Sequence, residues 1–367
     1  MSQLGFIFKE MFFPNRDRHA IPPLDGAMRP NSELDDVETI ARFDVPPVGL
    51  TSDGVGGVYC AVGNVIMKRN DAGLFEDFEG LDGEISALAA DGQNGLVAGV
   101  VGKGVRYIGG SAAGTEWTHA GGKSILHPTA IGIAPDGSIW VAEGSQQNAP
   151  KDIIRDLLEH GNSGRIIKCS ASGETKVITQ GLAYPSGLVC QSDGSVLVTE
   201  AWKHRLLRFR DDGRAPEVVV PNFAGYPGHL STGIDDGFLL CFFAMRTHLI
   251  EFLLEEDTYR KNMIDHVPPE YWVAPSLDCN ETLLTPLQFG RIKVHGETKA
   301  WAPPRSYGLV AHFDSEAIAT DSYHSRTNGE THGITSSCFA NGELLATCHA
   351  QKSIVRILSG QKEGQNV

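Results

Sequence analysis

His127–Glu143 (HPTAIGIAPDGSIWVAE) is repeated in outline at Tyr184–Glu200 (YPSGLVCQSDGSVLVTE). The proline, the Asp-Gly-Ser turn and the final glutamate of the two copies fall in register. Each copy predicts a strand, a tight turn and a second strand, because Asp-Gly tolerates the positive φ angles of a hairpin turn.

Four weaker copies follow the same plan and begin near Val48, Ile85, Tyr226 and His332. Six strand–turn–strand units, each long enough for two further strands, are typical of four-stranded propeller blades. The sequence therefore predicts an all-β fold, a six-bladed β-propeller. The alternative is a β-sandwich, in which the similarity of the two close copies would be a coincidence.

Two segments interrupt the repeat, and we expect inserts at residues 146–163 and 254–305. In the first, Ala149–Gly161 places its aliphatic side chains on one helical face, which predicts a short helix. The second is rich in proline and predicts an irregular insert over one face of the propeller. Residues 1–40 are expected to form an extended arm, and residues 41–367 the propeller.

Composition restricts the partners and the compartment. The net charge of −14 argues against nucleic acid, and no apolar stretch is long enough to span a membrane. Seven cysteines without CxxC spacing favour a reduced interior over disulfides or zinc. We expect a cytoplasmic protein with a small-molecule substrate, and the N-terminal arm makes a homodimer plausible.

Several segments resemble the strictosidine synthase-like family, within the gluconolactonase and paraoxonase propellers. They are Gly164-Arg-Ile-Ile-Lys, Gly181-Leu-Ala-Tyr-Pro-Ser-Gly-Leu, Val198-Thr-Glu-Ala and Phe223-Ala-Gly-Tyr-Pro-Gly-His-Leu. The resemblance implies a six-bladed propeller with its active site at one mouth of the central tunnel.

The resemblance also implies where a metal would bind. Calcium-dependent members hold one ion through Glu, Asn and Asp near the starts of inner strands, and the matching positions here are Val48, Ser186, and Gly228 with His229. Calcium prefers several charged oxygen ligands, so we expect no metal and no cofactor. Alkaloid-forming members use a Glu in the last blade, but the matching position here falls near Thr335.

Five side chains are candidates for acid–base chemistry at the tunnel mouth. His127, Tyr184, Tyr226 and His332 each come just before an inner strand, and His229 lies close to another strand start. Histidine titrates near neutral pH and is suited to proton transfer. We predict catalytic roles for the three histidines and Tyr184, and a substrate-binding role for Tyr226. The alternative is that each bonds a backbone carbonyl of a neighbouring blade.

Four further residues are candidate substrate contacts: Ser186, Glu143, Glu200 and Trp202. Both glutamates end a second strand, where pairing with Arg or Lys between blades is the favoured alternative. Ser186 lacks the Gly-x-Ser-x-Gly surroundings of a hydrolase nucleophile. Asp156, on the helical insert, is expected on a solvated face.

These observations leave three functions open. The leading one is metal-independent hydrolysis of a lactone or ester by His and Tyr acid–base chemistry. The second is a strictosidine synthase-like lyase or condensing enzyme that forms or breaks a C–C or C–N bond. The third is a propeller that binds a ligand without catalysis.

Overall fold

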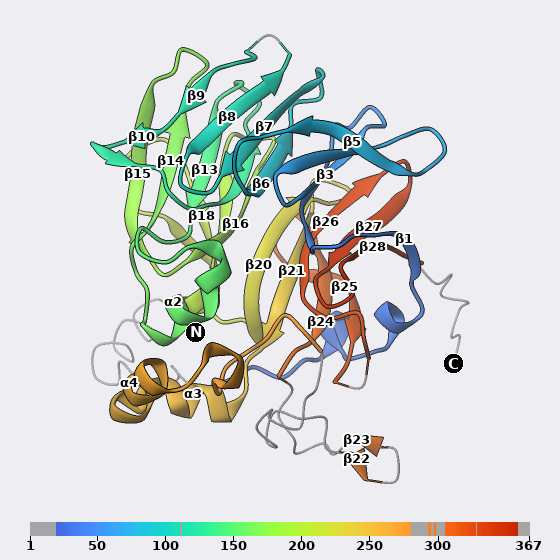
Figure 1. Cartoon of the computed structure of the whole chain (residues 1–367), viewed down its shortest axis with the longest axis vertical. Coiled ribbons are helices and arrows are strands. Elements are labelled where there is room, and N and C mark those ends of the chain that lie inside the picture. Colours follow the sequence, from blue (N-terminus) through green and yellow to red (C-terminus); the bar gives the residue numbers. More distant parts are fainter. Residues whose placement is uncertain are drawn as a thin grey trace.

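The computed structural model describes residues 20–110, 112–279, 305–327 and 329–358, and the backbone of a short hairpin, β22 (Lys293–Val294) and β23 (Glu297–Thr298). Six four-stranded antiparallel sheets form the ring of a propeller, as the repeat predicts (Figure 1).

The first three blades lie in chain order, each with its first strand innermost. Blade 1 contains β2 (Pro47–Ser52), β3 (Val58–Val62), β4 (Val65–Arg69) and β5 (Phe75–Gly80); blade 2 contains β6 (Ile85–Ala90), β7 (Gly95–Val100), β8 (Gly104–Gly109) and β9 (Glu116–Trp117); blade 3 contains β12 (Pro128–Ile133), β13 (Ile139–Glu143), β14 (Gly164–Cys169) and β15 (Thr175–Leu182). A small hairpin, β10 (His119–Ala120) and β11 (Lys123–Ser124), connects blades 2 and 3.

The last three blades also have their first strand innermost. An insert divides blade 5, and the N-terminal strand completes blade 6. Blade 4 contains β16 (Pro185–Cys190), β17 (Val196–Glu200), β18 (Arg205–Phe209) and β19 (Glu217–Val220); blade 5 contains β20 (Gly225–Thr232), β21 (Phe238–Met245), β24 (Gly308–Phe313) and β25 (Ala319–Ser325); blade 6 contains β26 (Ile334–Ala340), β27 (Glu343–Cys348), β28 (Ser353–Ile357) and β1 (Glu38–Arg42).

The two copies of the repeat have one register. Pro128 faces Glu143 across blade 3, and Pro185 faces Glu200 across blade 4. The glycines of both Asp-Gly turns have φ near +80° (+77° at Gly137), which a side chain would disfavour. The sequence repeat is therefore a structural repeat at the level of single residues.

The ring closes through the N-terminal strand, because β1 pairs antiparallel with β28. The expected arm boundary at residue 40 thus falls inside a blade strand. Before it, two 3₁₀ turns, Gly26–Met28 and Glu33–Asp35, pack against β25, and Leu34 is fully buried. Residues 1–19 lie outside the described residues, so the homodimer stays a prediction.

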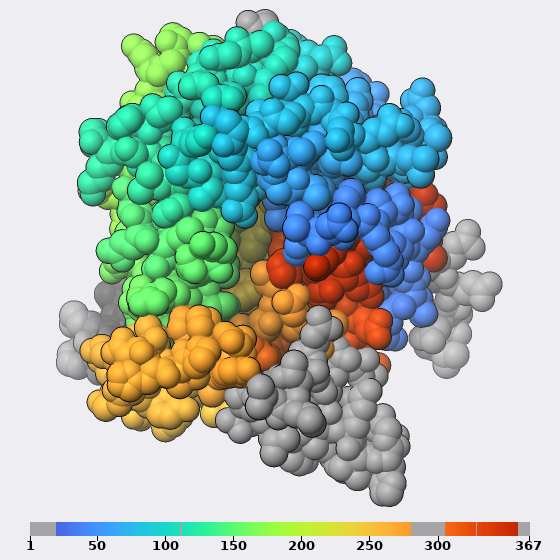
Figure 2. Space-filling model, viewed as in Figure 1, coloured from blue at the N-terminus to red at the C-terminus, as the bar shows by residue number. Residues whose placement is uncertain are grey.

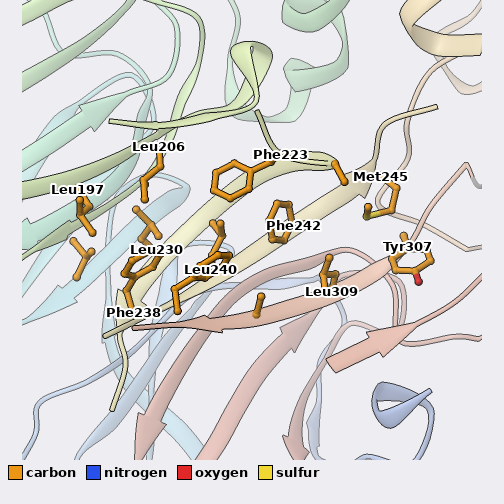
Figure 3. Close-up of a cluster of buried hydrophobic side chains, with 14 residues drawn as sticks. Leu197, Leu206, Phe223, Leu230, Phe238, Leu240, Phe242, Met245, Tyr307 and Leu309 are labelled. Carbon is orange, nitrogen blue, oxygen red and sulfur yellow. The ribbon is translucent and has the colours of Figure 1, made fainter. Parts of the chain in front are cut away.

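Apolar side chains fill the spaces between neighbouring blades. Figure 3 shows one such cluster, in which Leu197 and Leu206 of blade 4 meet Leu230, Phe238 and other residues of blade 5. Burial of these alternate strand positions is the main force that holds one blade to the next.

Both inserts contain helices, so, contrary to the expectation, the first part of the second insert is not irregular. The first contains α2 (Ile153–Leu158), and the second contains α3 (His248–Glu255), α4 (Asp257–His266) and the 3₁₀ turn Pro269–Tyr271. The second therefore begins before residue 254. The proline content misled that prediction, because the prolines follow the two helices rather than interrupt them. Most of residues 280–304 lie outside the described residues.

The inserts share one apolar cluster, which we call the cap: α2, α3, α4 and the segment through Asp278. Leu158 of α2 packs with Ile250 and Leu253 of α3 and with Met263 of α4. Figure 1 shows these helices together at one end of the molecule. No helix in the described part of the chain is long and apolar enough to cross a membrane.

Candidate functional site

A cavity of about 1420 Å³ lies between the inner strands and the cap. Figure 2 shows that this face is hollowed between the cap, which includes α2, and blades 1 and 6. Each blade contributes one equivalent inner-strand residue to the lining: Val48, Ser86, Thr129, Ser186, Gly228 and Thr335. Four of these, Val48, Ser186, Gly228 and Thr335, are the positions that sequence analysis matched to the family's site residues.

The hydroxyl groups of this lining connect the blades. Three of the four donate to the carbonyl of a proline in the next blade: Ser86 to Pro128 (2.7 Å), Thr129 to Pro185 (2.6 Å) and Ser186 to Pro227 (2.7 Å). The fourth, Thr335 Oγ1, lies 2.9 Å from Thr347 Oγ1 within blade 6. Buried carbonyls need such partners, so these bonds account for the hydroxyls structurally. The Ser186 hydroxyl therefore forms a hydrogen bond that links blades 4 and 5, although Ser186 also borders the cavity.

His229 lines the cavity from β20, at the residue after Gly228. Its Nδ1 is buried and has no hydrogen-bond partner among the residues that the structure describes. Burial lowers the pKa of His229 to about 4, because the protonated ring would lose its hydration. The imidazole is therefore neutral at pH 7 and can accept a proton.

Tyr184 lines the cavity from the turn before β16, with a left-handed φ of +56°. Its ring packs on the indole of Trp202, with the ring centroids 4.9 Å apart. Burial, together with the charge of Asp156, raises the pKa of the Tyr184 phenol. The hydroxyl keeps its proton at neutral pH and can act as a hydrogen-bond donor.

Asp156 is buried, which corrects the expectation of a solvated position. It is 1% exposed, and its Oδ1 accepts from Trp202 Nε1 at 2.8 Å. Asn148 Nδ2 donates to Oδ2 at 3.1 Å. The carboxylate therefore fixes α2 to blade 4 and orients the indole behind Tyr184. The error arose because the blade side chain that covers Asp156 lies far away in the sequence.

The other two candidate histidines are not among the residues that line the cavity. His332 is fully buried, and its ring nitrogens contact Ser306 Oγ and the Arg326 carbonyl, both at 2.8 Å. His127 Nδ1 lies 2.9 Å from the Ser145 carbonyl. Their sequence positions are equivalent to that of Tyr184, but their side chains contact backbone and hydroxyl groups in the protein.

Tyr226 and Trp202 lie behind the cavity wall, in a cluster with Phe243. Tyr226 is fully buried, and burial raises the pKa of its phenol. Neither its hydroxyl nor Nε2 of the adjacent His204 has a hydrogen-bond partner among the described residues. Of this cluster, Phe243 reaches the cavity.

Glu143 and Glu200 form buried ion pairs. Arg165 Nη2 lies 2.6 Å from Glu143 Oε2, and Arg205 Nε lies 2.5 Å from Glu200 Oε2. Both carboxylates also accept a backbone N–H from the loop before the inner strand of their own blade. These contacts favour the structural interpretation of the repeated glutamate, and neither residue lines the cavity.

Sequence analysis did not identify three charged residues of the cavity wall: Asp278, Arg305 and His349. His349 Nδ1 lies 3.0 Å from Asp278 Oδ1. Arg305 Nη2 donates to the Glu270 carbonyl at 2.9 Å. All three lie outside the repeated segments, so no sequence period marks them.

The lining does not fit the calcium site of the family's hydrolases. Val48, Ser186 and Gly228 offer no carboxylate at the matching positions, and the Ser186 hydroxyl is bonded to a backbone carbonyl. Within the described residues, no group of three or more His, Cys, Asp and Glu side chains is arranged to hold a metal ion.

The strictosidine synthase family model matches residues 129–212, which span blade 3 and most of blade 4. No sequence match to a curated protein accompanies it.

Solved structures with the same fold cover most of the chain. A gluconolactonase from Xanthomonas campestris is 12% identical, with 87% of this chain and 88% of that chain covered and a TM-score of 0.56. The calcium-binding protein regucalcin from Agrobacterium tumefaciens is 11% identical, with coverage of 87% and 92% and a TM-score of 0.53. A luciferin-regenerating enzyme is 12% identical, with coverage of 89% and 95% and a TM-score of 0.52.

At these identities the structures show the fold. The class that they define is a six-bladed β-propeller. Within it, the match over blades 3 and 4 confirms the resemblance to the strictosidine synthase-like proteins.

Proposed function

We propose that the protein is an enzyme that hydrolyses a lactone or ester of a small organic molecule in the cavity, without a metal ion. The observation that carries the proposal is His229. It borders the cavity, its pKa of about 4 keeps it neutral at pH 7, and its Nδ1 has no partner in the described protein.

We assign two roles in this reaction. His229 is the general base that takes a proton from the attacking water, and Tyr184 donates a hydrogen bond to the carbonyl oxygen as negative charge develops there. A base of such low pKa is weak while the substrate is neutral. Negative charge on the tetrahedral intermediate raises the proton affinity of the nearby imidazole, which assists the transfer.

Metal independence is part of the proposal and rests on the chemistry of the donor set. At the positions matched to the family's calcium ligands, a hydroxyl bonded to a backbone carbonyl and the His229 imidazole are poor ligands for calcium. The aromatic and aliphatic lining, which includes Tyr184, Phe243 and Trp272, suits an apolar organic substrate.

The test is turnover of a panel of lactones and aryl esters, with product identification, before and after treatment with EDTA. We expect hydrolysis that survives EDTA and protein that contains no stoichiometric calcium. Calcium at one ion per chain, with activity that EDTA removes and calcium restores, would overturn the metal-free mechanism. Product from amine–aldehyde pairs alone would favour the condensing enzyme, and ligand binding without any product would favour a binding protein.

A further inference from the structure

One wall of the cavity is charged. Asp278 and His349 face each other there at 3.0 Å, and Arg305 lines the same wall. The hydrogen bond from His349 holds the pKa of Asp278 below its usual range, and the positive charges of Arg305 and Lys352 add to this effect. Asp278 is thus anionic at neutral pH and hydrogen-bonded to His349. Arg305 and Lys352 add positive charge around it.

The Arg305 guanidinium has unused donors. Its Nη2 bonds the Glu270 carbonyl, while its Nε is buried without a partner. Among the described residues, no carboxylate forms an ion pair with it within 4.0 Å. An arginine remains charged even when half-buried, so this group presents a partly dehydrated cation with free N–H groups beside the cavity.

Glu270 lines the cavity beside Arg305, which donates to its backbone carbonyl, whereas the other acids of the lining come from elsewhere. Asp82 and Glu84 lie between blades 1 and 2, and Asp152 belongs to the insert of blade 3, across the ring from blade 6. Asp82 is paired with Lys103 at 2.8 Å. Arg305 therefore shares this part of the cavity with two acidic residues, Asp278 and Glu270, and among the described residues it forms an ion pair with neither.

An apolar wall borders the same cavity. Tyr184 and Phe243 come from blades 4 and 5, and Tyr271 and Trp272 come from the cap. A ligand that occupies both walls needs an apolar body and one anionic group. The planar fork of an arginine matches a carboxylate, whereas a phosphate dianion usually requires several cations or a helix N-terminus.

We propose that the substrate is an apolar carboxylic acid derivative whose free carboxylate binds Arg305 while its apolar body lies against the aromatic wall. The inference rests on the proposed function, because it names the substrate class of the same site. It makes Arg305 a specificity-determining residue rather than a member of the acid–base pair.

The test compares binding of 3-phenylpropionate with binding of its neutral match, 3-phenylpropanamide, by isothermal titration calorimetry. We expect the wild-type protein to bind the carboxylate about tenfold or more tightly, in line with a charge-assisted pair of hydrogen bonds. Arg305→Gln should lose this preference. Arg155→Gln is the matched control, because Arg155 also borders the cavity but is already paired with Glu159 at 2.8 Å.

All variants are compared only after circular dichroism and Tm confirm that they are folded. His229→Gln separates this inference from the proposed hydrolysis, because it should remove turnover and keep the preference for the carboxylate. No carboxylate preference in the wild-type protein, or a preference that survives in folded Arg305→Gln, would overturn the inference whatever the hydrolysis assays show.

Discussion

The blades and the cap use the same type of buried ion pair in different ways. In blade 3, Glu143 and Arg165 lie on adjacent strands of one sheet. Beside blade 5, Arg246 follows the second strand, whereas its partner Glu251 lies on α3, with Nη2 and Oε2 2.9 Å apart. The first pair holds a blade together, and the second holds the cap on the ring. The repeat therefore builds the scaffold and the inner-strand lining of the cavity, while unrepeated residues build the cap that covers it.

Breaking the blade pair should have the largest effect. Glu143→Gln removes the charge opposite Arg165, whose side chain is 3% exposed. We expect a loss of about 3–5 kcal/mol in the free energy of unfolding, because a buried cation is left without its counter-charge. Denaturant unfolding measures it.

Glu200→Gln is the matched control in blade 4. Glu200 pairs with Arg205, which is 28% exposed, and with Lys203, which is 49% exposed, so water compensates part of the lost pairs and the loss should be smaller. Equal losses for the two variants would show that burial does not set the strength of these pairs.

Breaking the cap pair should affect the cap more than the ring. Glu251→Gln leaves Arg246 with its bonds to Asn222 and to the Phe223 carbonyl. We expect a smaller global loss than for Glu143→Gln, together with faster hydrogen exchange in α3 and α4, because the cap can loosen while the ring stays folded. Slower or unchanged exchange there would contradict a tethering role.

Acid should weaken the protein through its buried neutral histidines. His229 and His324 both have a pKa of about 4, chiefly because of burial. Between their usual pKa near 6.5 and pH 4 the unfolded chain binds more protons, so stability is complete above 6.5 and falls as the pH drops, by up to about 1.4 kcal/mol per pH unit for each group.

His229→Gln should reduce the slope of stability against pH in that window. Denaturant midpoints measured from pH 7.5 to 4.5 test this. A slope identical to that of the wild-type protein would mean that His229 titrates normally.

The link between α2 and Trp202 should have the smallest effect. Trp202→Phe keeps an aromatic ring near Tyr184 but removes the donor to Asp156. We expect a loss of about 1–3 kcal/mol, the cost of leaving one buried acceptor unsatisfied. Asp156→Ala also removes the acceptor of Asn148 Nδ2, so the test is additivity: the double variant should lose less than the sum of the two single losses, and full additivity would argue against the bond.

The features that could be predicted are those carried by the repeat. The four positions matched to the family's site residues, Val48, Ser186, Gly228 and Thr335, all line the cavity. The direction of a side chain was not predictable in the same way. His332 and Tyr184 hold equivalent sequence positions, but only Tyr184 borders the cavity, because Ser306 and Arg326 engage the His332 ring.

The residues of the charged wall could not be found from the sequence. Asp278 and Arg305 belong to the insert of blade 5, and His349 follows the second strand of blade 6. They meet through tertiary packing, which no local period records. Helices α3 and α4 carried a local signal, since Thr247 caps α3 by accepting from Ile250 N–H at 3.3 Å, but the later prolines obscured it.

The most direct test of the central claim is kcat/KM for His229→Gln beside His127→Gln, on the best lactone or ester substrate. Both variants replace a half-buried histidine, but His229 borders the cavity, whereas His127 contacts the Ser145 carbonyl. We predict a fall of about 100-fold or more for His229→Gln, as for loss of a general base, and little change for His127→Gln. Wild-type turnover by folded His229→Gln would contradict the account.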